Sequence, residues 1–210
     1  LKAGIPHDIH AAGLVGRGVG GNGIQRLAAG LTAAVIRLLG IAAGLAATGK
    51  KVFFHSFGSF SSPRCYDQIY MSAAYSGLTV HVLGSDAGVC AAFNGGTHMP
   101  FEDMGTLMSI PDIKLVEPCD SVQLEWLIRE LQNAYGVYYI RMLRKLAVGV
   151  YEKGSAFEIG KMARLRDGTD VCIVASGIMV AEALRAAEAL QGARETVARC
   201  LGCDPKEIIF

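Results

Sequence analysis

The sequence contains no glutamate in its first hundred residues, and Glu102 is the first one. The earliest carboxylates are Asp8 and Asp67. Chemistry that depends on a glutamate therefore has no candidate in the first half of the chain. An excess of either charge is also missing, because 20 basic residues stand against 19 acidic ones, for a net charge of +1. A nucleic-acid-binding protein shows a basic stripe, so this balance argues against nucleic acid as a partner.

A disulfide pattern is missing too. The six cysteines are scattered through 210 residues, which predicts a reducing, cytoplasmic location. The first residues do not have the basic, apolar and small-residue regions of a secretory leader. The apolar stretch 27–49 has Arg37 at its centre, which costs about 2.5–3.5 kcal/mol in a membrane. We expect a close-packed buried helix there and no membrane partner.

Apolar residues make up 51% of the chain, enough for a sizeable core. Short apolar runs alternate with helical patterns, which predicts an α/β fold with a parallel sheet flanked by helices. The expected strands are 51–54, 78–83, 114–116, 137–140 and 170–175. The expected helices are 40–48, 64–76, 101–108, one that begins at Asp120 and is ended by Gly136, and 179–190.

Helix ends and strand ends carry further signals. Gly49 is placed to end the helix before it, and Asp120 is placed as an N-cap with Gln123 at the capping-box position. Ligands of parallel sheets bind beyond the carboxyl ends of the strands. We therefore expect the loops 55–64, 84–100 and 141–147 to line a site.

Five segments carry a resemblance to a known family. They are GIAAGLAATGKKVFF (40–54), FGSFSSPRCYDQIYMSAAY (57–75), GSDAGVCAAFNGGTHMPFEDMG (84–105), YYIRMLRK (138–145) and TDVCIVASGIMVAEAL (169–184). In this order and spacing they resemble the small, C-terminal subunit of a split transketolase. The resemblance covers about residues 40–190, and its most specific part is GGTHMPFED.

The resemblance implies a domain organisation and a cofactor. Residues 40–150 would form the pyrimidine-binding domain of the thiamine diphosphate-binding fold, and 151–190 a linker and the truncated start of the transketolase C-terminal α/β domain. Residues 1–39 and 191–210 stay unassigned. The diphosphate and Mg²⁺ would be held mainly by a separate large subunit. The reaction would be transfer of a two-carbon ketol unit between sugar phosphates, in a hetero-oligomer that also self-associates when its partner is missing.

The same resemblance assigns roles to single residues. Phe57 and Phe60 fall where the family stacks aromatic rings on the aminopyrimidine of the cofactor. His98, in a glycine-rich loop, would hold sugar hydroxyls or move a proton as the catalytic residue. Asn94 stands where many transketolases carry an aspartate that meets a substrate hydroxyl. Arg144 falls where members bind the substrate phosphate, which suits a guanidinium.

Two positions depart from the family pattern. The glutamate that protonates the cofactor's aminopyrimidine lies five residues before the glycine that matches Gly40, and that position is Val35. Valine cannot donate a proton, and losing acid–base catalysis typically slows a reaction about 10²–10⁴-fold. We therefore expect an impaired transketolase subunit. Ser85 and Asp86 lie where relatives carry His-Asp-Ser, but the histidine is missing, so the indication of a site role there is weak.

The two ends of the chain leave alternatives open. Residues 16–21 satisfy G-x-G-x-x-G, but no acidic residue follows at the required distance, so the pattern is weak evidence for nucleotide binding. Residues 193–210 resemble a cysteine desulfurase segment, and Cys200 and Cys203 form a lone C-x-x-C that does not suffice for a zinc site. One alternative function is a non-catalytic assembly partner. Others are an incomplete or frameshifted fragment and, on the tail alone, a pyridoxal-phosphate sulfur-transfer protein.

Overall fold

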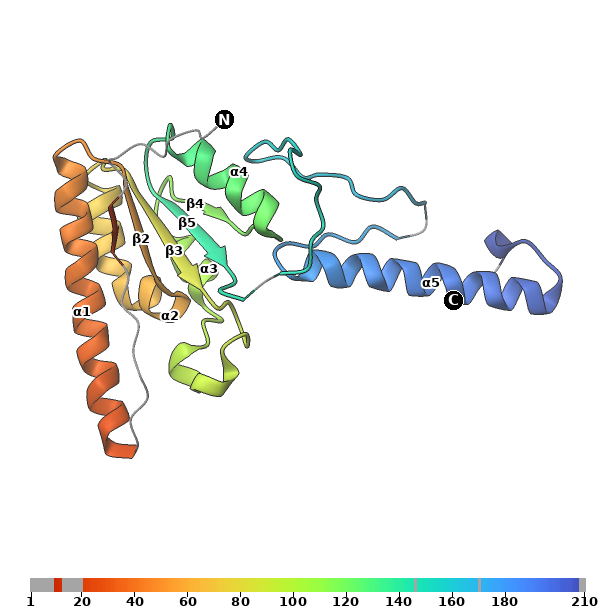
Figure 1. The fold of residues 1–210 in the computed structure, drawn as a ribbon, viewed down its shortest axis with the longest axis horizontal. Helices are drawn as coiled ribbons and strands as arrows, with labels where there is room; N and C mark the ends of the chain where they lie inside the picture. The colour runs from red at the N-terminus through yellow and green to blue at the C-terminus, as the bar shows by residue number, and fades with distance from the viewer. Residues whose placement is uncertain (1–9, 13–20, 146, 170, 208–210) are drawn as a thin grey trace.

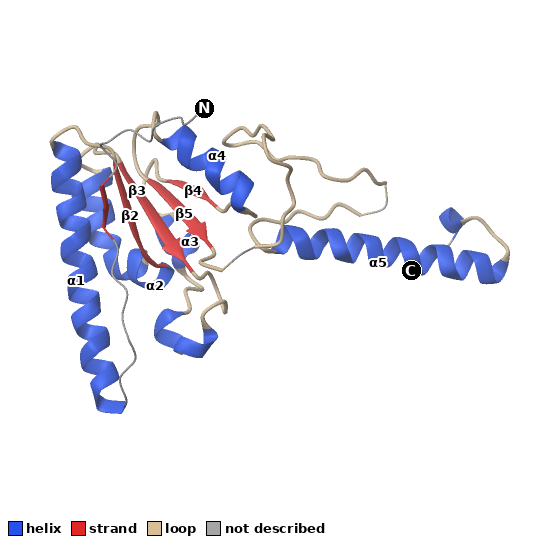
Figure 2. Ribbon diagram, in the orientation of Figure 1, coloured by secondary structure: helices blue, strands red, loops and turns tan. Residues whose placement is uncertain are grey.

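The computed structural model describes residues 10–12, 21–145, 147–169 and 171–207, with side chains in the first long helix given from residue 32 onward. Its centre is a five-stranded, wholly parallel sheet in the order β1-β2-β3-β5-β4 (Figure 2). The strands are β1 (His10–Ala12), β2 (Val52–Phe57), β3 (Val80–Ser85), β4 (Lys114–Val116) and β5 (Tyr138–Met142). The predicted α/β fold with a parallel sheet is confirmed.

The helical elements follow the alternation that the sequence predicts (Figure 1). The α-helices are α1 (Gly21–Ala47), α2 (Gly58–Ser61), α3 (Asp103–Leu107), α4 (Ser121–Leu131) and α5 (Met179–Leu201). Shorter turns are the 3-10 turns η1 (Pro63–Cys65), η3 (Ala92–Asn94), η4 (Gly96–His98) and η5 (Pro205–Glu207) and the π-helix η2 (Gln68–Ala74). The single α-helix expected over 64–76 is wrong, because this stretch divides into η1 and η2.

Alternating residues of the strands fill two separate cores. Val52, Phe54 and Tyr139 point to the face covered by α1 and η2. Phe53 and Ile140 point to the face covered by α4, where Leu127 and Leu131 are buried. Side chains of a strand alternate between faces, so β2, β3, β4 and β5 contribute to both cores, and the sheet lies between two helical layers.

Most helix ends lie where the sequence predicts, but α4 ends at Leu131 and not at Gly136. Gly49 has a φ of 83° and its N–H donates to the carbonyl of Ala46, which ends α1 near the expected residue. Asp120 caps α4 by accepting from the N–H of Gln123 at 2.9 Å. The Gln123 side chain accepts from the N–H of Cys119 instead of the N–H of Asp120, so the capping box closes one residue earlier than predicted.

The ends of the chain differ most from the sequence prediction. Within the part of the predicted strand 170–175 that the structure describes, residues 171–175 form no strand; residue 170 lies outside the described residues. A strand needs a hydrogen-bonded neighbour, and none of the strand pairings includes this segment. The helix expected at 179–190 is α5, which continues to Leu201 and ends at Gly202, whose φ is 69°. Residues 16–20 of the glycine-rich motif lie outside the described residues.

Candidate active site

Three loops gather at one edge of the sheet because β2, β3 and β5 are parallel. Phe57, Ser85 and Met142 are the last residues of these strands. The strands run two or three residues further than predicted, so Phe57 belongs to β2 and the loop after it begins at residue 58. Phe57, Phe60 and His98 lie at or beyond the carboxyl ends of these strands, where the site was expected.

The rings of Phe57, Phe60 and His98, here called the ring cluster, pack against one another. The His98 ring centroid lies 4.9 Å from that of Phe57 and 5.1 Å from that of Phe60, and both ring pairs meet edge to face. Phe57 and Phe60 are 6.3 Å apart. Phe60 is buried, whereas Phe57 and His98 are only partly buried. Aromatic faces at such spacing suit a flat heteroaromatic ligand.

The backbone holds the two loops of the ring cluster close together. A Cβ atom at Gly58 would lie 2.7 Å from Cγ of Pro100, so only glycine allows this approach. Gly95 has a φ of 80°, and its carbonyl accepts from the N–H of His98. The hydroxyl of Thr97 lies 2.9 Å from Nδ1 of His98. These contacts fix where the imidazole of His98 points.

Two arginines flank the ring cluster. The guanidinium of Arg64 lies 4.3 Å from the centroid of Phe60, and its Nη1 donates to the carbonyl of Thr97 at 2.9 Å. The guanidinium of Arg144 lies 5.1 Å from the centroid of Phe57. Cations over aromatic faces are attracted by the ring quadrupole. Two guanidinium groups therefore lie against the aromatic rings of the site.

These surroundings keep the nearby histidines neutral. Burial lowers the pKa of His98 below its ordinary value, and Arg64 and Arg144 lower it further, against the opposing effect of Asp86. The pKa of His55 is lowered by burial and by Arg144, again against Asp86. A neutral imidazole both accepts and donates a hydrogen bond, so His98 is suited to hold a hydroxyl or move a proton.

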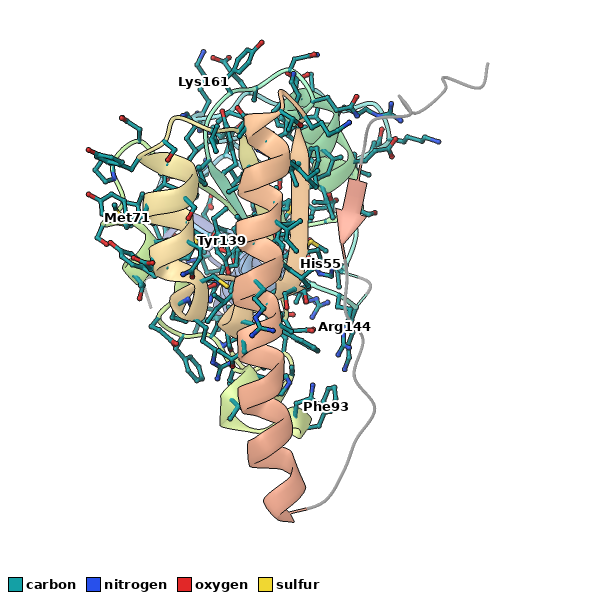
Figure 3. The ribbon with its side chains drawn as sticks, turned by 90° about the vertical axis from the view of Figure 1, so that its left-hand side faces the viewer. His55, Met71, Phe93, Tyr139, Arg144 and Lys161 are labelled. Atoms are coloured by element: carbon teal, nitrogen blue, oxygen red, sulfur yellow. The ribbon has the colours of Figure 1, made fainter. Side chains whose placement is uncertain are left out.

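Asp86, for which the sequence analysis gave only a weak indication of a site role, lies against Arg144 beside the ring cluster. It follows β3, is 1% exposed and has a left-handed backbone with a φ of 63°. Its Oδ2 lies 3.1 Å from Nε of Arg144. Figure 3 shows Arg144 along the same edge of the molecule as His55 and Phe93. A signal was present in the sequence, namely an aspartate directly after a strand that leads into a glycine-rich loop.

The other predicted residues are placed as follows. Arg144 is half exposed, and its guanidinium lies over the Phe57 ring of the ring cluster. Asn94 is exposed in η3, and among the described residues no ring or hydrogen-bond contact joins its side chain to the ring cluster. Val35 lies on α1 and is 4% exposed within the core between α1 and the sheet.

A charged network holds the loop that carries His98. Arg141 on β5 donates from Nε to Oδ2 of Asp103 at 2.9 Å and from Nη1 to Oε1 of Glu117 at 3.0 Å. The hydroxyl of Tyr139 donates to the same oxygen of Asp103 at 2.8 Å. Asp103 is fully buried and lies five residues after His98. The network therefore ties the end of this loop to the centre of the sheet.

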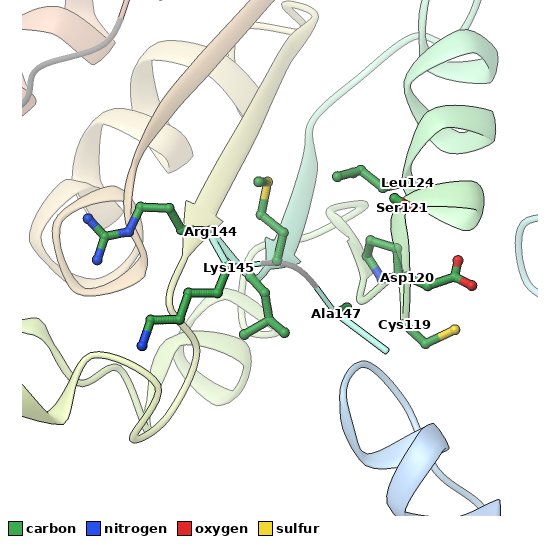
Figure 4. A pocket seen from close by; sticks show the side chains of 10 residues that line it. Cys119, Asp120, Ser121, Leu124, Arg144, Lys145 and Ala147 are labelled. Atoms are coloured by element: carbon green, nitrogen blue, oxygen red, sulfur yellow. The ribbon is translucent and has the colours of Figure 1, made fainter. Parts of the chain in front are cut away.

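A cavity of about 220 Å³ lies beside the site, between the start of α4 and the loop after β5. Its lining includes Asp120, Leu124 and Met142. Figure 4 shows the side chains of Arg144 and Lys145 pointing away from Cys119 and Asp120. Asp120 already accepts three backbone N–H groups, from Gln123, Val150 and Tyr151, so its carboxylate serves the fold.

Two kinds of feature are absent from the described ranges. No described helix is long and apolar enough to cross a membrane. Among the described side chains, no three from histidine, cysteine, aspartate and glutamate lie together as a metal site.

The described part of the chain is thus a parallel α/β domain with aromatic rings, a histidine and two arginines gathered at its strand ends. The family follows from comparison. Residues 36–149, more than half of the chain, match the model of the transketolase pyrimidine-binding domain. Residues 160–201 match that of the transketolase C-terminal domain. The chain belongs to the transketolase family.

Relatives include proteins named as transketolase subunits. The chain is 49% identical over 155 residues to the 6-deoxy-6-sulfo-D-fructose transketolase subunit SqwH of a Clostridium species. The matched residues make up 74% of this chain and 48% of the relative. It is 37% identical to one of the subunits of the apulose-4-phosphate transketolase of Phocaeicola vulgatus, covering 70% of this chain and 48% of the relative. The chain thus spans about half the length of these curated relatives.

A solved structure agrees in fold. It is described as a split-gene transketolase in an inactive beta4 tetramer, and it matches with a TM-score of 0.69 and 33% identity over 76% of this chain and 51% of the other. The predicted resemblance to the transketolase family is therefore confirmed. The assignment of roles to single residues stays a prediction, as do the domain boundaries at 40, 150 and 190.

Proposed function

We propose that this chain is the pyrimidine-binding part of a transketolase that shares its thiamine diphosphate with a separate large subunit. In this proposal it takes part in transfer of a two-carbon ketol unit between sugar phosphates. The observation that carries the proposal is the ring cluster of Phe57, Phe60 and His98, which lies at the sheet edge within a matched transketolase domain. The subunit names of two relatives support the division into two chains.

The residues present fit the aminopyrimidine part of the cofactor. Phe57, partly buried at the end of β2, would offer an apolar ring face to a flat heteroaromatic group, and the buried ring of Phe60 lies 6.3 Å behind it. Gly58 brings the loop of Pro100 close enough to narrow the site around them. When bound, thiamine diphosphate supplies a nucleophilic carbon that carries the two-carbon unit. In the proposal, the large partner holds the diphosphate and Mg²⁺.

The polar residues around the rings would bind the sugar. His98, kept neutral by burial and the neighbouring arginines, would orient a hydroxyl or move its proton. Arg144 would hold the anionic end of the sugar, because guanidinium nitrogens bind tetrahedral anions well. Asn94, exposed four residues before His98, would contact a further hydroxyl through its amide.

Val35 supports the further proposal that turnover is impaired. It stands where the family's acidic residue is expected, and it is buried among apolar side chains of α1 and the sheet. No proton can come from this position. The same observation favours a second candidate function, a non-catalytic partner that assembles with a large subunit and does not turn over substrate.

A calorimetric titration tests the proposal. Thiamine diphosphate with Mg²⁺ is titrated into this chain mixed with a transketolase large subunit, with each chain alone as control. We expect binding only in the mixture and weaker binding when the chain carries Phe60→Ala. No heat in the mixture, with both chains folded, would overturn the shared-cofactor proposal.

Turnover separates the two candidate functions. Ketol transfer by the mixture is compared for the wild-type chain, Val35→Glu and Val35→Gln, where the last two side chains differ in the acidic group but little in size. We expect low activity in the wild type and an increase in Val35→Glu alone. Absence of activity in all three, with cofactor bound, would favour the assembly partner. Robust wild-type turnover would contradict the impairment.

Location and assembly belong to the same proposal. We propose a cytoplasmic location, supported by six cysteines that are all unpaired.

Exposed apolar side chains, including Val89, Phe93 and Phe101 near the site, support assembly with a partner or self-association. Light scattering of the isolated chain checks the second point, and a monodisperse monomer would count against it.

A further inference from the structure

Asn94 and Gly95 form an asparagine–glycine pair in the loop that carries His98. Asn94 is the last residue of the 3-10 turn η3, and its side chain is exposed. Among the described residues, its side-chain amide makes no hydrogen bond. Figure 1 shows this loop projecting beyond the ends of β2 and β3. The amide carbon of Asn94 is therefore open to attack.

The backbone of Gly95 supplies a nucleophile next to this carbon. Gly95 has a φ of 80° and a ψ of 176°, a conformation that residues with a Cβ atom rarely adopt. A Cβ atom built at Gly95 would meet nothing within 4 Å, so the space beside this backbone is open. Because glycine has no Cβ atom, nothing on this residue hinders the approach of its nitrogen to Cγ of Asn94.

One contact opposes the attack, and one favours it. The N–H of Gly95 donates to the carbonyl of Ala92 at 3.0 Å, within η3. The net contribution of a single hydrogen bond is small, so opening this one slows the attack by about tenfold at most. Nζ of Lys145 lies 5.4 Å from the ring centroid of Phe93, next to Asn94. A positive charge nearby stabilises the deprotonated nitrogen that attacks.

We propose that Asn94 is a modification site, at which the nitrogen of Gly95 displaces the side-chain amide and leaves a carboxylate in the loop of His98. A bond forms between that nitrogen and Cγ of Asn94, and the Cγ–Nδ2 bond breaks. The amide leaves as ammonia with the proton of the Gly95 N–H, which closes a succinimide ring. Water then opens the ring, at Cγ to give aspartate or at the backbone carbonyl carbon to give isoaspartate. In sum, asparagine and water give the acid and ammonia, without a change in oxidation state.

The two products act differently on His98. The N–H of His98 donates to the carbonyl of Gly95 at 3.0 Å, and the hydroxyl of Thr97 lies 2.9 Å from its Nδ1. Isoaspartate adds one carbon to the main chain before Gly95, so it should move this carbonyl and the imidazole with it. Aspartate keeps the main chain and adds a negative charge four residues before His98, which favours the protonated ring.

The rate of conversion is measured on the folded full chain. The protein is kept at pH 8 and at pH 6 and is then digested with pepsin at low pH, where the reaction is slow. Mass spectrometry measures the fraction of the Asn94 peptide that has gained about 1 Da, and chromatography separates aspartate from isoaspartate. Measuring single peptides keeps Asn94 apart from Asn22, which is also followed by a glycine.

Asn133 is the internal comparison. It is exposed like Asn94 but is followed by Ala134, whose Cβ atom hinders the same attack. We expect Asn94 to convert at least about tenfold faster than Asn133 at pH 8. Conversion should be slower at pH 6, because the deprotonated nitrogen is the nucleophile. Equal rates at the two asparagines would overturn the proposal, because the fold would then protect Asn94.

Two variants test the chemistry. Asn94→Gln should remove most of the conversion at this position, because glutamine has to close a larger ring. Gly96→Ala keeps the asparagine–glycine pair, and its Cβ atom would meet only Cε of Met99, at 4.0 Å. It should convert at the wild-type rate. A rate in Gly96→Ala that falls to the rate of Asn133 would overturn the role given to the pair.

The effect on His98 is measured by NMR titration of its ring. Asn94→Asp imitates one product, and Asn94→Gln is the neutral control. A carboxylate within about 10 Å in a water-like dielectric should raise the proton affinity of the His98 ring about twofold. Equal titration midpoints in the two variants would overturn this effect. Neither measurement uses the cofactor or a partner chain, so a failure here is distinguishable from a failure of the proposed function.

Discussion

Two segments of similar apolar sequence have opposite environments in this molecule. Val80 and Val82 on β3 are fully buried, with β2 on one side and β5 on the other. Val171 and Val174, in a run of equal β propensity, are 68% and 71% exposed and belong to no strand. Figure 1 shows the region after β5 extending away from the sheet, with α5 projecting from it. The difference shows that an apolar run forms a buried strand only where neighbouring strands pair with it.

The largest expected effect comes from truncating the same residue type in the two regions. Ile140→Ala on β5 removes a side chain with no exposure and should lower the free energy of unfolding by about 3–4 kcal/mol. Ile173→Ala, at 52% exposure, should change it by less than about 0.5 kcal/mol. Urea unfolding followed by circular dichroism measures both. Similar losses would show that residues 171–175 are packed after all, and the comparison would fail.

A smaller effect should appear with pH, through a histidine within the sheet. Burial lowers the pKa of His81 to about 4, and its Nε2–H donates to the carbonyl of Leu131 at 3.0 Å. The unfolded imidazole has a pKa of about 6.5. Between these two values the unfolded chain binds a proton that the folded chain excludes, so stability falls as pH drops. The contribution is constant above about pH 6.5 and is lost progressively down to about pH 4.

The expected loss between pH 7.5 and pH 5 is about 2 kcal/mol. His81→Gln keeps an amide donor for Leu131 without a titrating group, so its free energy of unfolding should depend less on pH over this range. Unfolding in urea at both pH values provides the measurement. An unchanged pH dependence in His81→Gln would assign the effect to other groups and contradict the role given to His81.

The smallest of the three effects concerns the link between the two regions. Asp120 accepts from the N–H of Gln123 at 2.9 Å, which caps α4, and from the N–H groups of Val150 and Tyr151 at 2.9 and 2.8 Å. Burial alone would raise the pKa of Asp120, but these backbone hydrogen bonds lower it overall. Asp120→Ala should cost about 1–2 kcal/mol.

The same variant should speed hydrogen exchange at Val150 and Tyr151 while leaving β3 protected. This pattern would locate the attachment of the C-terminal region at Asp120. Exposed Ser121, the next residue, offers Ser121→Ala as a matched control with little expected change. Unchanged exchange at Val150 in Asp120→Ala would show that the region is held by other contacts, such as the hydrogen bond of Ser176 to Glu117 at 2.6 Å.

Much of the fold was predictable because local signals agreed with the tertiary structure. The strand 114–116 has the predicted bounds, and the cap at Asp120 and the stop at Gly49 form as expected. The ends of β2 and β3 were not predictable, because Phe57, Gly84 and Ser85 join their strands only through pairing with neighbours. Gly84 in particular is required by the ring of Tyr139, whose Cε2 would lie 2.7 Å from a Cβ atom there.

Some features of the candidate site could likewise be predicted from the sequence, and others could not. The motif around His98 and the two phenylalanines could be singled out in the sequence, because these segments resemble those of the transketolase family. The burial of Asp86 could not be predicted from the sequence, because an aspartate after a strand is usually a solvated loop residue. Only the three-dimensional contacts bury it and set it against Arg144.

The sequence by itself determined the parallel α/β domain, the family and the residues that form the aromatic floor, because periodicity, caps and short motifs are local properties of the chain. The tertiary structure decided which apolar runs are buried and which charges face one another. Burial and pairing depend on segments far apart in sequence: Val80 and Val171 differ only in their neighbours, and Asp86 meets Arg144 only because β3 and β5 lie side by side.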